Sequence, residues 1–406
     1  MKLSIISQGF SNWGGGIDFI RHLARLISLA DKENTIKKSL ILPGADWISG
    51  ANFFLFPLLG IANNLKVLRN PQFCKRFIFS KKYFQETFDD QKNNYDLIYS
   101  GSTFSSQIKA IKKISPDVVF PLMKPPPVGF NIPWVGYIYD FQHKYLPEFF
   151  TAEEIQYRNR IFAEMLTRSS HIMVNAKSVA NDARHFHPES ASKIYAIPFS
   201  PCPSKLWLDL DIDARRKYGI NRPYFMISNQ FWRHKDHITA FHAFARYLES
   251  GGRAMLVCTG ETVDYRFPNY FFELMNLIKD LNISENVMIL GHISKIDQIA
   301  LMKKSIAVIQ PSLFEGGPGG GAAYDAISLG IPLIASNIPV NLEIDCGDVT
   351  YFLAGNHSEL CDELLDRGVK TYGISKALLW EDGISRAIRA GNFIINMAND
   401  AIKNAK

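Results

Sequence analysis

Short β-branched and aromatic runs alternate with amphipathic helical patterns along the whole chain, and this alternation restricts the fold more than any other feature. A strand, a helix and a further strand in succession favour a right-handed crossover and a parallel sheet covered by helices. A first series of expected strands spans 3–7, 39–42, 97–100, 118–121, 135–139, 172–175 and 194–197, and a second spans 224–228, 254–259, 287–290, 306–311 and 332–335. The sequence therefore predicts the α/β fold class, with two Rossmann-like, doubly wound domains facing a cleft.

The length of 406 residues also favours two domains, because a single hydrophobic core rarely grows beyond about 250–300 residues. The turn-rich stretch FSPCP separates the two series of strands. We expect an N-terminal domain over residues 1–200 and a C-terminal domain over 201–383. An amphipathic helix is expected over 384–406. It can pack on the C-terminal domain or back on the N-terminal domain.

Composition points to an ordinary globular protein, with 47% hydrophobic and 21% charged residues. The five cysteines form no C-x-x-C pair, which indicates free thiols in a reducing compartment. The N-terminus lacks the pattern of a signal peptide, and no apolar run reaches the roughly 18 residues of a membrane span. These features predict a cytoplasmic protein. The longest apolar run, residues 51–62, is interpreted as a buried segment or as a surface that dips into a membrane interface.

The net charge of +6 is concentrated in the N-terminal part, where residues 1–130 hold 17 Lys or Arg against 9 Asp or Glu. Most of it comes from the pairs Lys37-Lys38, Lys75-Arg76, Lys81-Lys82 and Lys112-Lys113. Such a basic half suits peripheral contact with an anionic membrane at its inner face, an acidic acceptor, or simply a solvated surface. Nucleic acid is not expected as a partner, because no nucleic-acid-binding motif accompanies the charge.

The segment from Pro311 to Pro339, PSLFEGGPGGGAAYDAISLGIPLIASNIP, carries the strongest chemical signal. It leaves a predicted strand at the edge where open α/β sheets bind ligands, and it enters a helix near Ala322. Its glycines allow backbone amides to approach a phosphate or a sugar, and the helix N-terminus adds partial positive charge. These glycines are Gly316, Gly317, Gly319, Gly320 and Gly321. Two carboxylates flank the loop, Glu315 and Asp325, and both are suited to accept hydrogen bonds from sugar hydroxyls.

This segment resembles the retaining glycosyltransferases of family 4 (glycosyl transferases group 1), which have the GT-B fold and a P-S-x-x-E-G-x…E-A-x-x-x-G-x-P signature. By position, the resemblance implies that Glu315 contacts the donor sugar and that Asp325 holds the nucleotide ribose. The sequence departs from the signature in two ways. Asp stands in place of the second Glu, and the two carboxylates lie ten positions apart rather than eight.

The segment SNQFWRHKDH, residues 228–237, follows a predicted strand of the second series. In the family it resembles, a G-R-x-x-x-x-K pattern here neutralises the donor diphosphate. Lys235 falls on the Lys position, Gln230 stands where the Arg is expected, and Arg233 is the candidate to supply the missing charge. Cations can stabilise a leaving diphosphate without a metal ion. We therefore expect metal-independent chemistry with no cofactor.

Two segments of the first series complete the expected site. The glycine loop SQGFSNWGGGIDF resembles the family's N-terminal GG loop, with Gly15 and Gly16 as the candidates, although a tight turn alone would also account for them. Asp140 and His143 follow a predicted strand, where either is placed to orient or deprotonate an acceptor hydroxyl or to belong to a structural network. The cluster Arg184, His185 and His187 lacks the ligand set of a zinc site.

Taken together, the residues and the resemblance predict a glycosyltransferase that moves a sugar from a UDP- or GDP-sugar to a saccharide or lipid-linked acceptor. Retention of anomeric configuration and a role in surface polysaccharide or glycan biosynthesis are implied by the resemblance alone. Two alternatives remain open, a nucleotide-sugar epimerase on the same fold and a catalytically weak nucleotide-sugar-binding subunit. A dinucleotide-dependent dehydrogenase is disfavoured, because neither glycine loop has the G-x-G-x-x-G spacing.

Overall fold

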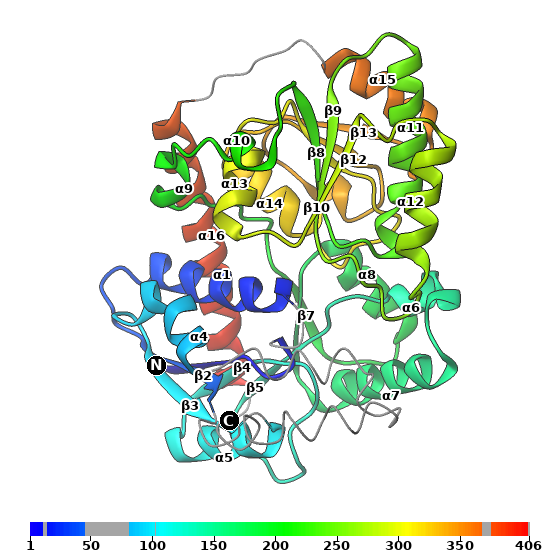
Figure 1. Cartoon of the computed structure of the whole chain (residues 1–406). Helices are drawn as coiled ribbons and strands as arrows, with labels where there is room; N and C mark the ends of the chain where they lie inside the picture. The colour runs from blue at the N-terminus through cyan, green and yellow to red at the C-terminus, as the bar shows by residue number, and fades with distance from the viewer. Residues whose placement is uncertain (11–13, 45–80, 102, 368–374, 405–406) are drawn as a thin grey trace, which may run out of the picture.

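Two parallel sheets organise the chain in the computed structural model, which describes residues 1–10, 14–44, 81–101, 103–367 and 375–404 (Figure 1). The first sheet has the order β3-β2-β1-β4-β5-β6-β7 and the second has the order β10-β9-β8-β11-β12-β13. The strands of the first sheet are β1 (Lys2–Ile6), β2 (Lys37–Pro43), β3 (Asp96–Ser100), β4 (Val118–Leu122), β5 (Trp134–Tyr137), β6 (His171–Val174) and β7 (Lys193–Ala196). Those of the second are β8 (Tyr224–Ser228), β9 (Met255–Thr259), β10 (Val287–Gly291), β11 (Val308–Gln310), β12 (Leu333–Ser336) and β13 (Val349–Phe352).

Helices flank both sheets, as right-handed crossovers require. Around the first sheet lie α1 (Gly14–Ala30), α4 (Lys81–Thr87), η4 (Asp89–Gln91), α5 (Phe104–Ile114), α6 (Gln142–Tyr145), η5 (Pro147–Phe149), α7 (Ala152–Arg168) and α8 (Lys177–Phe186). The second half contains α9 (Lys205–Asp209), α10 (Ala214–Tyr218), η6 (Arg233–Lys235), α11 (His237–Glu249), α12 (Tyr270–Asp280), α13 (Lys295–Met302), α14 (Gly320–Ser328), η7 (Asn341–Glu343), α15 (His357–Arg367) and α16 (Lys376–Lys403).

The predicted fold class is confirmed, and every predicted strand lies within two residues of an observed one. The central strands were readable because both of their faces are buried, which selects continuous apolar runs such as the one in β4. The edge strand β13 was not predicted, because it has only four residues and three of them are only partly buried. The apolar run over 51–62 lies outside the described residues.

Helix α16 connects the two halves of the molecule, and Figure 1 shows it running past α9 and down to β4 and β5. It begins eight residues before the predicted start, where Ser375 caps its first turn by accepting a hydrogen bond from the backbone of Leu378. Its first turns place Leu379 and Trp380 against the core of the second sheet. Its later turns bury Ile394 in the core of the first sheet, mainly against α1.

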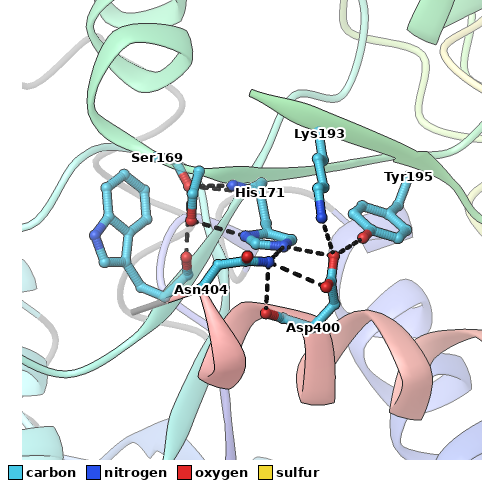
Figure 2. A network of polar contacts seen from close by, with 8 residues as sticks. Ser169, His171, Lys193, Tyr195, Asp400 and Asn404 are labelled. Atoms are coloured by element: carbon cyan, nitrogen blue, oxygen red, sulfur yellow. Dashed lines mark hydrogen bonds and ion pairs between the residues drawn. The ribbon is translucent and has the colours of Figure 1, made fainter. Parts of the chain in front are cut away.

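A polar network fixes the C-terminal end of α16 to the first sheet (Figure 2). One carboxylate oxygen of Asp400 contacts His171 Nε2 at 3.0 Å, Lys193 Nζ at 2.9 Å and the Tyr195 hydroxyl at 2.5 Å. Asn404 donates to the other oxygen at 3.0 Å. The hydrogen bonds from Lys193, Tyr195 and His171 hold the pKa of Asp400 well below its usual range, so the carboxylate is ionised at neutral pH. The network therefore ties β6 and β7 to a helix more than 200 residues away in sequence.

The described helices include none that is both long and apolar enough to cross a lipid bilayer.

The close crossing of α1 and α16 gives a test of how the halves are joined. Gly391 is buried in α16, and a Cβ atom there would overlap the carbonyl oxygen of Leu26. Helix propensity alone predicts that Gly391→Ala stabilises the protein by about 1 kcal/mol. The overlap reverses the sign, and we expect a loss of about 1–3 kcal/mol in the free energy of unfolding, measured by denaturant titration.

The matched control is Asn392→Ala, one residue later on the exposed face of the same helix. We expect it to change stability by less than about 0.5 kcal/mol. A stabilised Gly391→Ala variant would show that α1 and α16 are not packed at this distance.

Candidate functional site

The glycine loop after β11 lies directly against the strand ends of the first sheet. A Cβ atom on Gly316 would overlap the carbonyl oxygen of Tyr139, and one on Gly317 would lie 3.0 Å from Cβ of Asn175. Residues 139 and 175 follow β5 and β6, at the edge where parallel α/β sheets bind ligands. Only glycine permits this approach, so the loop brings the candidate residues of both domains to one place.

Glu315 and Lys235 form a buried ion pair at the centre of this place. The same carboxylate oxygen, Glu315 Oε1, also accepts hydrogen bonds from Gln310 Nε2 at 2.9 Å and Ser312 Oγ at 2.6 Å. Asn229 donates to Gln310 at 2.8 Å and thereby fixes the orientation of that amide. Within the described part of the chain all these bonds reach Oε1, so Oε2 is left to accept a hydrogen bond from a ligand.

Helix α14 begins beside this carboxylate. Its N-cap, Gly319, and its first residue, Gly320, both have positive φ, which glycine adopts without strain. The amide of Gly319 donates to Asn341 Oδ1 at 2.8 Å, which anchors the loop to η7. A Cβ on Gly320 would lie 3.3 Å from Glu315 Oε2. The positive end of the α14 dipole therefore faces the open oxygen of Glu315.

Asp325, the second predicted carboxylate, lies on α14 and pairs with Lys295, the first residue of α13. Burial raises the pKa of Asp325, and the neighbouring Lys295 ammonium opposes that rise. Lys295 was not among the predicted site residues. It follows β10 at the ligand-binding edge of the second sheet, so the rule that selected Asp140 after β5 would also have selected this lysine.

Gly15 and Gly16 lie in the first turn of α1, and residues 11–13 of the same predicted loop lie outside the described residues. Gly15 is exposed and Gly16 is buried. Asp18, one turn further on, is close enough to Lys295 and Asp325 to raise the pKa of both. The start of α1 thus faces the Lys295–Asp325 pair across the two domains.

Gln230 and Arg233 do not bring a second cation to Lys235. Gln230 lies in the turn between β8 and η6 and has no charge. The Arg233 guanidinium lies 4.6 Å from the centre of the Phe267 ring and 3.4 Å from Glu273 on α12. Successive residues of a 3₁₀ turn point about 120° apart, so residues 233 and 235 of η6 face different directions.

Asp140 and His143 differ in their surroundings although they are neighbours in sequence. Asp140 accepts a hydrogen bond from Arg158 at 3.0 Å, and its Cβ would lie 3.2 Å from a Cβ on Gly316, so it belongs to the assembled site. His143 is buried beside three phenylalanines of the first domain, Phe141, Phe150 and Phe162, and its Nε2 lies 3.1 Å from Asn159 Oδ1. The structure places His143 in the packing that supports the site.

Two arginines near the site were not predicted: Arg158, which pairs with Asp140, and Arg266, which lies 3.5 Å from Gln142 Oε1. In the described ranges no group of three or more His, Cys, Asp and Glu side chains could hold a metal ion. His187 contacts Glu189 at 3.4 Å, and Arg184 donates to Asn181.

Residues 211–367, which include the whole second sheet, match the family model of glycosyl transferases group 1. Comparison with curated protein sequences gave no significant match. Among solved structures, Anabaena HepE in complex with UDP and glucose is similar, with a TM-score of 0.57, 14% identity, and coverage of 100% of this chain and 99% of that chain. A glycosyltransferase from Rickettsia africae has a TM-score of 0.56 and 14% identity, and the match covers 100% of this chain and 97% of that chain. Sucrose-phosphate synthase from Thermosynechococcus elongatus has a TM-score of 0.57 and 14% identity, and the match covers 98% of this chain and 97% of that chain.

These likenesses, together with the two parallel sheets, establish the GT-B fold of two Rossmann-like domains facing a cleft. The matched residues, 211–367, include Lys235, Glu315 and Asp325, and the match supports a glycosyltransferase.

The surroundings of His143 predict an imidazole that stays neutral over the physiological range. Burial, and next the charge of Arg158, lowers the pKa of His143 to about 4. We expect its ring to titrate near pH 4 in an NMR pH series, against about 6.5 in an unfolded chain. The unfolded chain then binds the proton more readily, so the stability contribution is complete above pH 6.5 and is lost as the pH falls towards 4. A titration midpoint above pH 6 would contradict this placement.

Proposed function

We propose that this chain is a retaining, family 4-type glycosyltransferase that moves a sugar from a nucleotide-sugar donor to a saccharide or lipid-linked acceptor. The observation that carries the proposal is the arrangement around Glu315, with Lys235 on one oxygen and the start of α14 beside the other. Asp140 approaches the same loop from the opposite domain. The similar Anabaena HepE has been solved with UDP and with UDP-glucose, which supports a UDP-sugar as the first donor to test, with GDP-sugars next.

In the proposed complex, the donor lies along the loop from α14 to α13. The diphosphate is held by the amides at the start of α14, where Gly320 and Gly321 lack side chains, and by the Lys235 ammonium. Sugar hydroxyls donate to Glu315 Oε2, and the ribose hydroxyls donate to Asp325. Lys295 neutralises Asp325 until the ribose is bound.

The proposed reaction breaks the bond between the anomeric carbon and the phosphate oxygen, and the electron pair leaves with the diphosphate. The acceptor oxygen forms its bond to the same face of the sugar, and its proton passes to the departing phosphate. Lys235 and the α14 dipole stabilise the developing charge, so we propose that no metal or cofactor is required. Closure of the two domains around the donor excludes water that would otherwise hydrolyse it.

We propose that the acceptor reaches the site from the first domain, in surface polysaccharide or glycan biosynthesis. The excess of basic residues in 1–130 supports work at an anionic, cytoplasmic membrane face.

Donor binding is tested by thermal shift with UDP, GDP and their sugars, and the stabilisation should grow with ligand concentration for the correct nucleotide. Lys235→Ala removes the cation at the diphosphate, and we expect it to abolish most of that shift. Lys279→Ala, which removes an exposed lysine on α12, is the control and should keep it. An unchanged shift in the Lys235→Ala variant would remove Lys235 from the diphosphate site.

Retention is tested on the product. We expect the NMR coupling constant of the new anomeric proton to show the configuration of the donor sugar, and an inverted product would refute this part of the proposal. Conversion of the donor to an epimer without any acceptor would instead identify an epimerase. Nucleotide binding without turnover over a broad acceptor panel would indicate a binding subunit, for which the uncharged Gln230 is the motivating observation.

A further inference from the structure

Two arginines, one from each domain, lie on the same aromatic ring at the edge of the site. The guanidinium carbon of Arg158, on α7, is 4.5 Å from the centre of the Phe150 ring, and that of Arg266, in the loop between β9 and α12, is 4.9 Å from it. The side chains are only 16% and 7% exposed. These are two nearly buried positive charges, and each has one carboxylate within 4 Å, Asp140 for Arg158 and Asp264 for Arg266.

Most of the hydrogen-bonding capacity of this pair is unused. A guanidinium has five N–H donors. Within the described residues, Arg158 uses one of them on Asp140, and Arg266 makes a single long contact of 3.5 Å to Gln142 Oε1. Arg266 Nε is buried with no hydrogen-bond partner, and so is Nδ1 of the adjacent His234. Buried donors of this kind are normally satisfied, which indicates that an acceptor is missing.

The neighbouring carboxylate of Asp264 does not supply that acceptor. Its oxygens accept backbone hydrogen bonds from Arg233 at 3.1 Å and Arg266 at 3.0 Å, so it holds the two loops together. The distance from Asp264 Oδ1 to Arg266 Nε is 3.9 Å, which is too long for a hydrogen bond. Asp264 therefore pairs with Arg266 by charge without accepting a side-chain hydrogen bond from it, and Arg266 Nε keeps an unused donor.

The arginine pair lies near Glu315, the residue proposed to contact the donor sugar. Arg158 holds Asp140, whose Cβ faces Gly316 of the glycine loop, next to Glu315. Arg266 packs over the exposed ring of Tyr265 at 5.5 Å, and an aromatic face of this kind suits the apolar face of a sugar. The Lys235 ammonium and the start of α14 already provide for the diphosphate in the proposed function.

From these contacts we infer that Arg158 and Arg266 form a subsite for an acidic saccharide, whose carboxylate or phosphate receives the two guanidinium forks. Guanidinium groups bind such planar or tetrahedral anions through paired N–H bonds. The inference rests on the proposed function and adds a substrate class to it. The anion is carried either by the donor sugar or by the acceptor, and because the arginines come from different domains, its binding also favours domain closure.

The test compares acidic and neutral ligands by calorimetry on the full chain. The donor arm pairs UDP-glucuronic acid with UDP-glucose and GDP-mannuronic acid with GDP-mannose. The acceptor arm pairs glucuronic acid and glucose 6-phosphate with glucose, at a saturating concentration of the nucleotide that binds. We expect an at least tenfold preference for the acidic partner in one arm, and that arm identifies the carrier of the charge.

The Arg266→Gln variant should reduce the preference to below threefold while its affinity for the free nucleoside diphosphate changes less than twofold. Arg266→Lys keeps the charge without the fork and should give an intermediate preference, which guards against a misfolded Gln variant. The control is Arg253→Gln, at an exposed residue just before β9. Equal binding of acidic and neutral ligands in both arms, with nucleotide binding intact, overturns this subsite alone. If the wild-type chain binds no nucleotide, the proposed function fails and the subsite fails with it.

Discussion

The contact between α1 and α16 is the constraint on which the placement of the two sheets depends. Gly391 allows the two helices to approach backbone to backbone at Leu26, and the first turns of α16 pack Leu379 and Trp380 against the core of the second domain. Arg25 of α1 adds hydrogen bonds to the carbonyl oxygens of Cys202 and Pro203 in the linker. The linker and α16 are the two segments that connect the domains, and both contact α1. The relative position of the strand ends, and hence of the site, follows from that helix.

Contacts on the opposite side of the molecule complete this arrangement. Helix α8 begins after Ala176, which has no side chain able to cap it, and Glu343 of η7 accepts hydrogen bonds of 2.7 Å from the amides of Lys177 and Ser178. Ile338 packs into the same core of the first domain. A cap from the other domain stabilises α8 only while the domains are together. The joined arrangement therefore contains interactions that each domain lacks alone.

The sequence allowed the strands and the glycine loop to be predicted, because burial on both sheet faces and close backbone approach each restrict residue type. It also assigned Lys235 and Glu315, which come from two separate segments, to the same donor site, and these two side chains meet. The directions in which these side chains point could not be predicted from the sequence. Arg233 turns to α12 because of the 3₁₀ geometry of η6, and His143 packs among phenylalanines of the first domain. Arg158 and Arg266 carry no local signal, since only the packing of two domains brings them together.

The site carboxylates show how a polar cleft remains stable before a substrate binds. An ionised carboxylate in a buried position costs several kcal/mol unless it is paired, and here Glu315 and Asp325 each pair with a lysine. Lys235 has three N–H donors, so it can contact a phosphate oxygen while it keeps Glu315. Lys295 is in a different position, because the ribose hydroxyls compete with it for Asp325. In the proposed complex the Lys235–Glu315 pair is therefore preorganised, whereas the Lys295–Asp325 pair must rearrange. Displacing Lys295 from Asp325 costs free energy, so ribose binding contributes less net affinity than the contacts to Asp325 alone would give.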